Sequence, residues 1–97
     1  MPRNPPRPTP EQARRELDAL YAALQRGDVE LGDAVRRMRH VSGLTQPQFA
    51  AHRGISVQAL RDVESGRGNP TVNTLNAIVG VFGLKVGLVP NPPQQRP

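Results

Sequence analysis

The sequence contains no cysteine and no tryptophan, and only three of its 97 residues are aromatic. Without cysteine the chain forms no disulfide and has no thiolate chemistry, and its redox compartment stays undetermined. With so few aromatic side chains it lacks the platforms on which single-stranded bases stack. This scarcity argues against the binding of single-stranded nucleic acid or RNA loops.

Long hydrophobic runs are also missing. No apolar stretch approaches the ~20 residues that span a bilayer, and the proline-rich start Met1–Pro6 has no hydrophobic segment of the kind found in secretory signals. We therefore expect a cytoplasmic protein without a membrane partner.

Residues that bind metals or catalyse reactions are few and scattered. His40 and His52 are twelve residues apart, a spacing that fits no usual metal pair. The carboxylates that suggest paired acid–base chemistry are Asp18, Asp28, Glu30 and Asp33. They fall at expected helix starts and on polar faces, where capping and solvation account for them. The sequence thus predicts no metal, no cofactor and no enzyme.

What the sequence does contain is an excess of positive charge. The formal net charge is +5, and 12 of the 13 basic side chains are arginine. A basic balance favours an anionic partner such as nucleic acid, an anionic membrane or an acidic protein. The planar guanidinium suits phosphates and guanine edges, but charge alone does not separate these partners from a surface that only aids solubility.

Prolines and helical periodicity divide the chain into one all-α domain with two tails. Nine of the 11 prolines lie near the ends, within residues 2–10 and 90–97. The expected segments are a disordered tail over 1–8, an N-terminal helix over 9–27, a helical domain over 28–83, a strand over 84–90 and a disordered tail over 91–97. The expected helix caps are Thr9, Asp28, Thr45, Ser56 and Thr71.

The strand is expected because Leu84, Val86 and Leu88 alternate with their neighbours. A single strand has no partner in an otherwise helical chain, so its backbone donors and acceptors must be satisfied elsewhere. The economical partner is the same strand of a second copy, paired about a two-fold axis. The alternative is an extended tail that lies on its own domain.

Residues 44–66 carry the pattern most informative about function. Two short helices are joined by the turn Gly54-Ile55-Ser56, and the second presents polar side chains in its first turns. A major groove accepts such a helix while the preceding helix lies across the backbone. The N-terminus of that preceding helix, at Gln46, aims free N–H groups at a phosphate.

An ordered set of residues makes the pattern specific: Leu44-Thr45-Gln46, Phe49-Ala50, Gly54-Ile55-Ser56, Leu60, Val63-Glu64-Ser65-Gly66, Pro70 and Leu75. This set resembles the phage-repressor-like (Cro/cI, or xenobiotic-response-element) helix-turn-helix family. The resemblance covers about residues 30–83 and implies that 28–83 is a helix-turn-helix DNA-binding domain. The DNA-facing residues that it implies are Thr45, Gln46, Ser56, Val57, Gln58, Arg61, Asp62, Arg67 and Asn69.

The resemblance also implies roles for these residues. Gln46 grips a phosphate and braces the recognition helix, Gln58 pairs with adenine, and Arg61 reads guanine or holds a phosphate. Val57 touches a thymine methyl group, and the loop residues Arg67 and Asn69 contact the DNA backbone.

Two acidic residues need separate interpretations. Asp62 brings a negative charge near phosphates; it either accepts from a cytosine amino group or neutralises Arg61, and the second is favoured slightly. Arg39 and Glu64 occupy the positions of a structural ion pair in the family that the chain resembles.

Two functions follow from the resemblance. The first is a transcriptional repressor or regulator that binds double-stranded DNA as a homodimer on a near-palindromic operator. The second is an antitoxin that neutralises a toxin and represses its own operon, because a terminal strand after such a domain looks like the HipB-type antitoxins. The helix over residues 10–26 departs from that pattern. Its apolar stripe has three alternative roles: to hold a partner, to pack on the domain or to lengthen a dimer interface.

Overall fold

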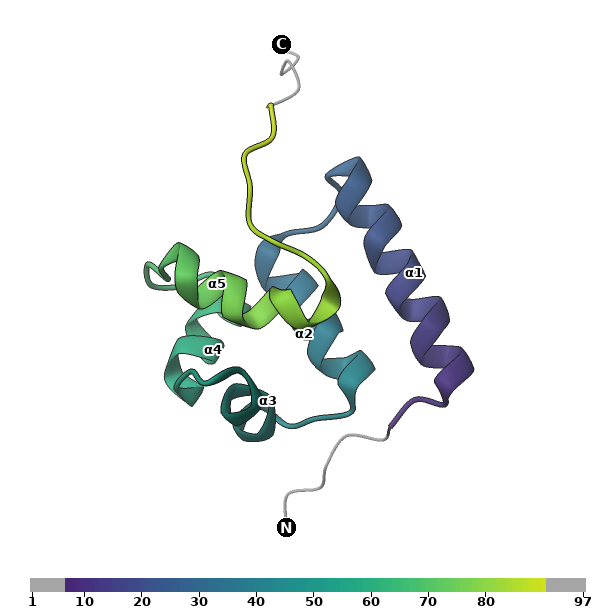
Figure 1. The fold of residues 1–97 in the computed structure, drawn as a ribbon, viewed down its shortest axis with the longest axis horizontal. Coiled ribbons are helices and arrows are strands. Elements are labelled where there is room, and N and C mark those ends of the chain that lie inside the picture. Colours follow the sequence, from purple (N-terminus) through teal and green to yellow (C-terminus); the bar gives the residue numbers. More distant parts are fainter. Residues whose placement is uncertain (1–6, 91–97) are drawn as a thin grey trace.

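The computed structural model describes residues 7–90, where five helices and a short 3-10 turn surround a single core (Figure 1). The elements are α1 (Pro10–Arg26), α2 (Leu31–Ser42), α3 (Gln46–Arg53), α4 (Val57–Ser65), α5 (Val72–Val79) and η1 (Gly80–Phe82). The all-α expectation is confirmed for these residues. None of the helices among them has the length and apolar character needed to cross a membrane. The expected tail 91–97 and most of the tail 1–8 lie outside the described residues.

Local sequence signals determine most helix ends. Four of the expected caps accept a backbone N–H from three residues further along: Thr9, Thr45, Ser56 and Thr71. At Thr45, Gln48 returns a second bond, since its Oε1 accepts from the Thr45 N–H at 2.9 Å. Such reciprocal capping satisfies donors that a helix start otherwise leaves unpaired.

Two expected helix boundaries are wrong. Asp28 does not cap the second helix, because α2 begins at Leu31 after Glu30 and Asp28 instead accepts from Arg26 Nε at 2.7 Å. The last helix does not reach Gly83 as one α-helix. It tightens into η1 after Val79, and only then does Gly83 end it with a φ of 72°.

The extra N-terminal helix packs on the domain, which is one of the three roles left open for it. Leu20 of α1 is fully buried in the same cluster as Met38 of α2 and Ile78 of α5. Tyr21 of α1 donates its hydroxyl hydrogen bond to the Phe82 carbonyl of η1. The apolar stripe of α1 is therefore part of the core.

The end of α5 and η1 are also held from α3. The Arg53 guanidinium lies 4.1 Å from the Phe49 ring centre and 5.5 Å from the Phe82 ring centre. Its Nε donates to the Ile78 carbonyl at 3.4 Å. Burial lowers the pKa of the Arg53 guanidinium from its usual value, and the ring faces and the carbonyl offset that desolvation.

The expected strand over 84–90 is absent from the described part of the chain. Leu84 packs against the core, and the Val86 N–H donates to Asn76 Oδ1 at 2.8 Å. Beyond this point the segment runs outward from the helices, and Leu88 is fully exposed (Figure 1). A strand is defined by its pairing, and residues 7–90 offer this segment no second strand.

The contact between α2 and α4 depends on a glycine. A Cβ atom at Gly32 would lie 2.6 Å from the Glu64 carbonyl oxygen and 2.9 Å from the Val63 carbonyl oxygen. Both are backbone atoms at the end of α4, so they cannot move aside as a flexible side chain does. Glycine at this position allows the two helices to approach closely.

We expect Gly32→Ala to destabilise the fold by about 1–3 kcal/mol, because the added methyl group overpacks the α2–α4 contact. Gly80→Ala is the matched control, since an added methyl group there would meet no neighbouring atom within 4 Å and the φ of Gly80 is −62°. Urea unfolding followed by circular dichroism measures both. Equal free energies of unfolding for Gly32→Ala and the parent chain would contradict the packing argument.

Candidate nucleic-acid interface

The turn between α3 and α4 presents one side of α4 to solvent. Gly54 adopts a left-handed conformation with a φ of 67°, and the Ile55 N–H closes the turn on the Ala50 carbonyl at 3.1 Å. Leu60 and Val63 are buried, at 0% and 3% exposure, and they fix the inner side of α4 to the core. The outer side therefore carries the exposed polar residues.

An open depression runs along this outer side and over the neighbouring parts of α2 and α3. It is lined by Arg36, Arg39, Gln46, Gln58, Arg61, Asp62, Glu64, Ser65 and Arg67. Five of the DNA-facing residues expected from the sequence thus lie together on one surface. Thr45 and Ser56 lie next to it as the caps of α3 and α4, and Val57 is the first residue of α4. Asn69 lies further round, in a separate depression that also includes Asp62.

Beneath the depression lies a buried ion pair. Glu64 is 5% exposed. Its two carboxylate oxygens accept from Arg39 Nε at 2.9 Å and from Arg39 Nη2 at 3.0 Å. This two-point geometry joins α2 to α4 and is the form in which a guanidinium binds a carboxylate best.

Gln46 connects this ion pair to the surface. Its Nε2 donates to Glu64 Oε1 at 3.1 Å, and its Oε1 accepts from Arg61 Nε at 3.3 Å. Since Glu64 is a pure acceptor, it determines which end of the Gln46 amide faces inward. The outward-facing oxygen then holds the exposed Arg61.

Asp62 does not make the contact that the sequence favoured. Its expected role was to neutralise Arg61, but Arg61 bonds to Gln46, and Asp62 Oδ1 accepts from Gln58 Nε2 at 2.9 Å. The spacing explains the difference, because side chains four residues apart on a helix lie above one another, whereas adjacent ones diverge. Contact of Asp62 with cytosine stays a prediction.

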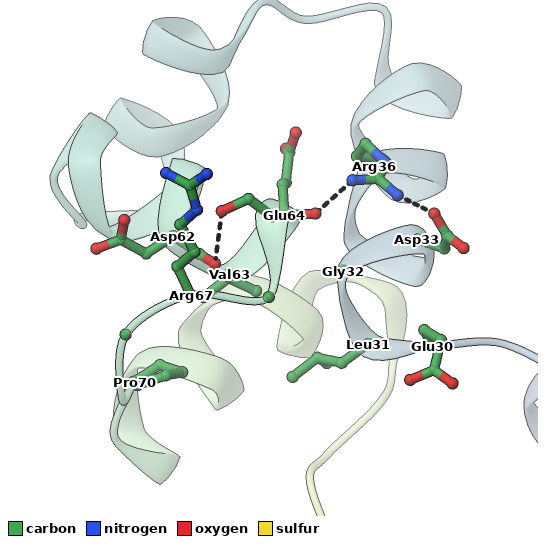
Figure 2. Close-up of a pocket in the computed structure, with 13 residues that line it drawn as sticks. Glu30, Leu31, Gly32, Asp33, Arg36, Asp62, Val63, Glu64, Arg67 and Pro70 are labelled. Atoms are coloured by element: carbon green, nitrogen blue, oxygen red, sulfur yellow. Dashed lines mark hydrogen bonds and ion pairs between the residues drawn. The ribbon is translucent and has the colours of Figure 1, made fainter.

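The structure adds Arg36, which the sequence pattern did not single out. Its guanidinium donates to the Glu64 backbone carbonyl and to the Asp33 carboxylate, and its side chain is about half exposed. Figure 2 shows it between the start of α2 and the end of α4. The sequence feature that could have identified Arg36 is its position one helical turn before Arg39, which places the two side chains on the same face of α2.

The charge on this surface favours a polyanion. Arg61 and Arg67 are exposed and Arg36 is half exposed, whereas the Glu64 carboxylate is buried and paired with Arg39. Asp62 is the second acidic side chain that lines the depression, and it does not bond to an arginine there. A row of cations of this kind attracts phosphates and makes binding depend on salt.

Comparison with known proteins agrees with this geometry. A family model described as a helix-turn-helix domain matches residues 30–90. The chain is 34% identical over 59 residues to the immunity repressor protein of Bacillus phage phi105, covering 61% of this chain and 41% of that protein. It is 41% identical over 54 residues to the uncharacterized HTH-type transcriptional regulator y4dJ of Sinorhizobium fredii, covering 56% of this chain and 70% of that protein.

A third relative is the HTH-type transcriptional regulator DdrOP3 of Deinococcus deserti, with 34% identity over 58 residues that cover 60% of this chain and 45% of that protein. The chain thus spans less than half the length of the phage and Deinococcus relatives, and most of that of the Sinorhizobium one. No solved structure matches the chain.

We expect Glu64→Ala to destabilise the fold by about 3 kcal/mol, because it leaves the Arg39 charge without its partner in a side chain only 21% exposed. Arg39→Ala should have a comparable cost. The double variant Arg39→Ala/Glu64→Ala should lose clearly less stability than the sum of the two single-variant losses, since both substitutions remove the same interaction. Thermal unfolding of the four proteins measures this coupling, and strictly additive losses would contradict it.

Proposed function

The chain belongs to the helix-turn-helix domain family, and on that premise we propose that it is a sequence-specific regulator of transcription that binds double-stranded DNA. The observation that carries the proposal is the two-sided character of α4. Its apolar side is anchored by Leu60 and Val63, and its polar side is exposed next to a row of arginines. A helix held in this way enters a major groove without distorting the domain.

Reading of the bases is assigned to the first turns of α4. Gln58 pairs with the N6 and N7 atoms of adenine, and Arg61 reads guanine or holds a phosphate. Val57, at the start of α4, touches a thymine methyl group. The bond from Arg61 to Gln46 favours this arrangement, because it places Arg61 beside the N-terminus of α3.

Backbone contacts are assigned to the residues around α4. Gln46 and the start of α3 face one phosphate, where the helix dipole and the Gln46 backbone N–H favour an anion; the Gln48 N–H is already bonded to Thr45. Ser56 caps the start of α4, and Arg67 and Asn69 follow the helix in the loop. Arg36 joins them because its half-exposed guanidinium lines the same depression.

Repression is the direction of regulation that we propose. One relative is named an immunity repressor, and a small domain that covers its operator excludes other proteins from that DNA. The homodimer places two recognition helices in successive major grooves, about 34–36 Å apart, so the operator is a near-palindrome.

The segment 84–90 is the proposed dimer contact. Leu88 is fully exposed and Val89 is 83% exposed. Within the described residues, the Val86 N–H finds its acceptor in the Asn76 side chain and not in another strand. Pairing with the same segment of a second copy satisfies the backbone and brings the exposed Leu88 against that copy, whereas Val89 lies on the opposite face of the strand.

An antitoxin function is the alternative proposal. It is favoured by the same exposed apolar segment after a helix-turn-helix domain, which offers a surface to a toxin as readily as to a second copy. A neighbouring reading frame that encodes a toxin, and co-purification of its product with this chain, distinguish this alternative from a repressor without a protein partner.

We expect Gln58→Ala and Arg61→Ala each to lower specific DNA affinity by about 1–3 kcal/mol, because each removes base contacts. The probe is the site selected by the parent chain from random duplex DNA, measured by fluorescence anisotropy. Thermal stability should be unchanged in Gln58→Ala, since that side chain is exposed.

Arg67→Ala is the matched control for these variants. It should weaken all duplexes about equally and lower the slope of log affinity against log salt by about 1, as loss of one phosphate contact does. If Gln58→Ala and Arg61→Ala bind the selected site with parental affinity, the groove assignment is wrong.

We expect Leu88→Asp to convert the dimer into monomers, because a charge would then be buried in the strand pair. In the single chain this side chain is fully exposed, so the substitution leaves the fold intact. Lys85→Asp is the control and should stay dimeric, since Lys85 alternates with the apolar residues. Sedimentation of the full chain measures the mass; a monomeric parent chain, or an unchanged dimer in Leu88→Asp, would reject this contact.

A further inference from the structure

Asp62 lies within the proposed DNA-reading surface, where a carboxylate is unfavourable for affinity. It shares the depression with Arg61 and Arg67, which would face phosphates. A negative charge there repels the DNA backbone and weakens binding to every sequence. Its position therefore requires a benefit that does not come from affinity.

The contacts of Asp62 indicate that benefit. Its Oδ1 accepts from Gln58 Nε2 at 2.9 Å. Its Oδ2 faces the loop that follows α4, at 3.4 Å from where a Cβ on Gly68 would lie. The carboxylate is therefore directed along the helix, with one oxygen on Gln58 and the other against the loop.

The loop also holds the backbone of Asp62. Its carbonyl oxygen accepts from the Arg67 N–H at 2.8 Å and from the Ser65 hydroxyl at 3.3 Å. Asp62 is half-buried, whereas Gln58 is exposed. Asp62 is held more firmly than Gln58 and therefore constrains the Gln58 side chain.

A carboxylate constrains an amide in a specific way. An ionised carboxylate only accepts hydrogen bonds, so it can bind the NH₂ end of Gln58 but not its oxygen. Rotating the amide by half a turn would bring two acceptors together. The remaining N–H and the oxygen of Gln58 are then presented in a fixed order, which is what pairing with N7 and N6 of adenine requires.

We propose that Asp62 is a positioning residue that fixes the orientation of the Gln58 amide and thereby determines base preference at the pair that Gln58 reads. This inference deepens the proposed function and depends on it. Asp62 weakens general attraction to DNA and increases discrimination between bases, in the manner of residues that provide specificity at a cost in affinity.

The experiment compares Asp62→Asn and Asp62→Ala with Gln58→Ala in the full chain. Asparagine keeps the shape of the side chain without its charge, but its amide can either accept from Gln58 or donate to it, whereas alanine removes both the contact and the charge. Each protein selects sites from duplexes with a random core of about 30 base pairs, enough for two half-sites one helical turn apart. Affinities are then measured for every single-base variant of the parental site.

Asp62→Ala should lose discrimination on the order of tenfold, at the same base pair as Gln58→Ala. Asp62→Asn should also lose discrimination at that pair, because the asparagine NH₂ can donate to the Gln58 oxygen and the amide is then free to turn over. Both should bind unrelated duplex DNA more tightly than the parent chain, because a negative charge is gone. The double variant Gln58→Ala/Asp62→Ala should show no further loss of discrimination at that pair, since Asp62 acts there through Gln58.

Three results would overturn the proposal, and each has its own meaning. Discrimination lost at a different base pair from that of Gln58→Ala assigns Asp62 to direct reading of cytosine. Tighter DNA binding without any change in base preference would mean that Asp62 acts only through its negative charge. If the parent chain enriches no sequence at all, the proposed function fails first, and this inference with it.

Discussion

The carboxylate of Glu64 lies almost fully buried where α2, α3 and α4 meet. An ionised group in such a place is costly unless its oxygens are bonded and its charge is paired. Both conditions are met, because Arg39 donates to both oxygens and Gln46 donates to one of them. The Glu64 backbone carbonyl also accepts from Arg36. The three helices are therefore joined by directional bonds that permit few relative orientations.

Non-directional packing closes the same junction from the other side. Leu60 and Val63 bury the inner side of α4, and Gly32 lets the backbone of α2 approach its end. Packing alone would tolerate small rotations of α4 about its axis. The chain from Arg39 through Glu64 and Gln46 to Arg61 prevents that rotation, so the ion pair determines which side chains of α4 reach the surface.

Local chemistry explains what the sequence could predict. Thr45 and Ser56 cap helices through contacts three residues away, and Gly54 ends α3 in a conformation that other residues adopt rarely. Asp28 failed as a cap because Val29 also contacts the core, so two more residues are used before α2 begins. The strand over 84–90 is absent because Leu84 packs on the core and the Val86 N–H bonds to the Asn76 side chain, so the start of this segment is held by its own domain.

Two of the missed parts of the site depend on how the helices pack together. Arg36 joins the surface only because the end of α4 lies beside α2. The bond between Gln46 and Arg61 spans 15 residues of sequence. The pairing of Gln58 with Asp62 is local, but the sequence offers Arg61 as an equally close partner, and side-chain direction on the helix decides between them.

Contacts of α1 and α3 meet at η1, directly before the segment of the proposed dimer contact. Tyr21 bonds to the Phe82 carbonyl, and Arg53 of α3 stacks on the Phe82 ring, directly before the chain leaves as 84–90. The distance between two recognition helices in a dimer depends on the direction in which that segment leaves each domain. In the proposed dimer, a helix that fixes this direction would set half-site spacing without touching DNA, so α1 would contribute to recognition as well as to the core.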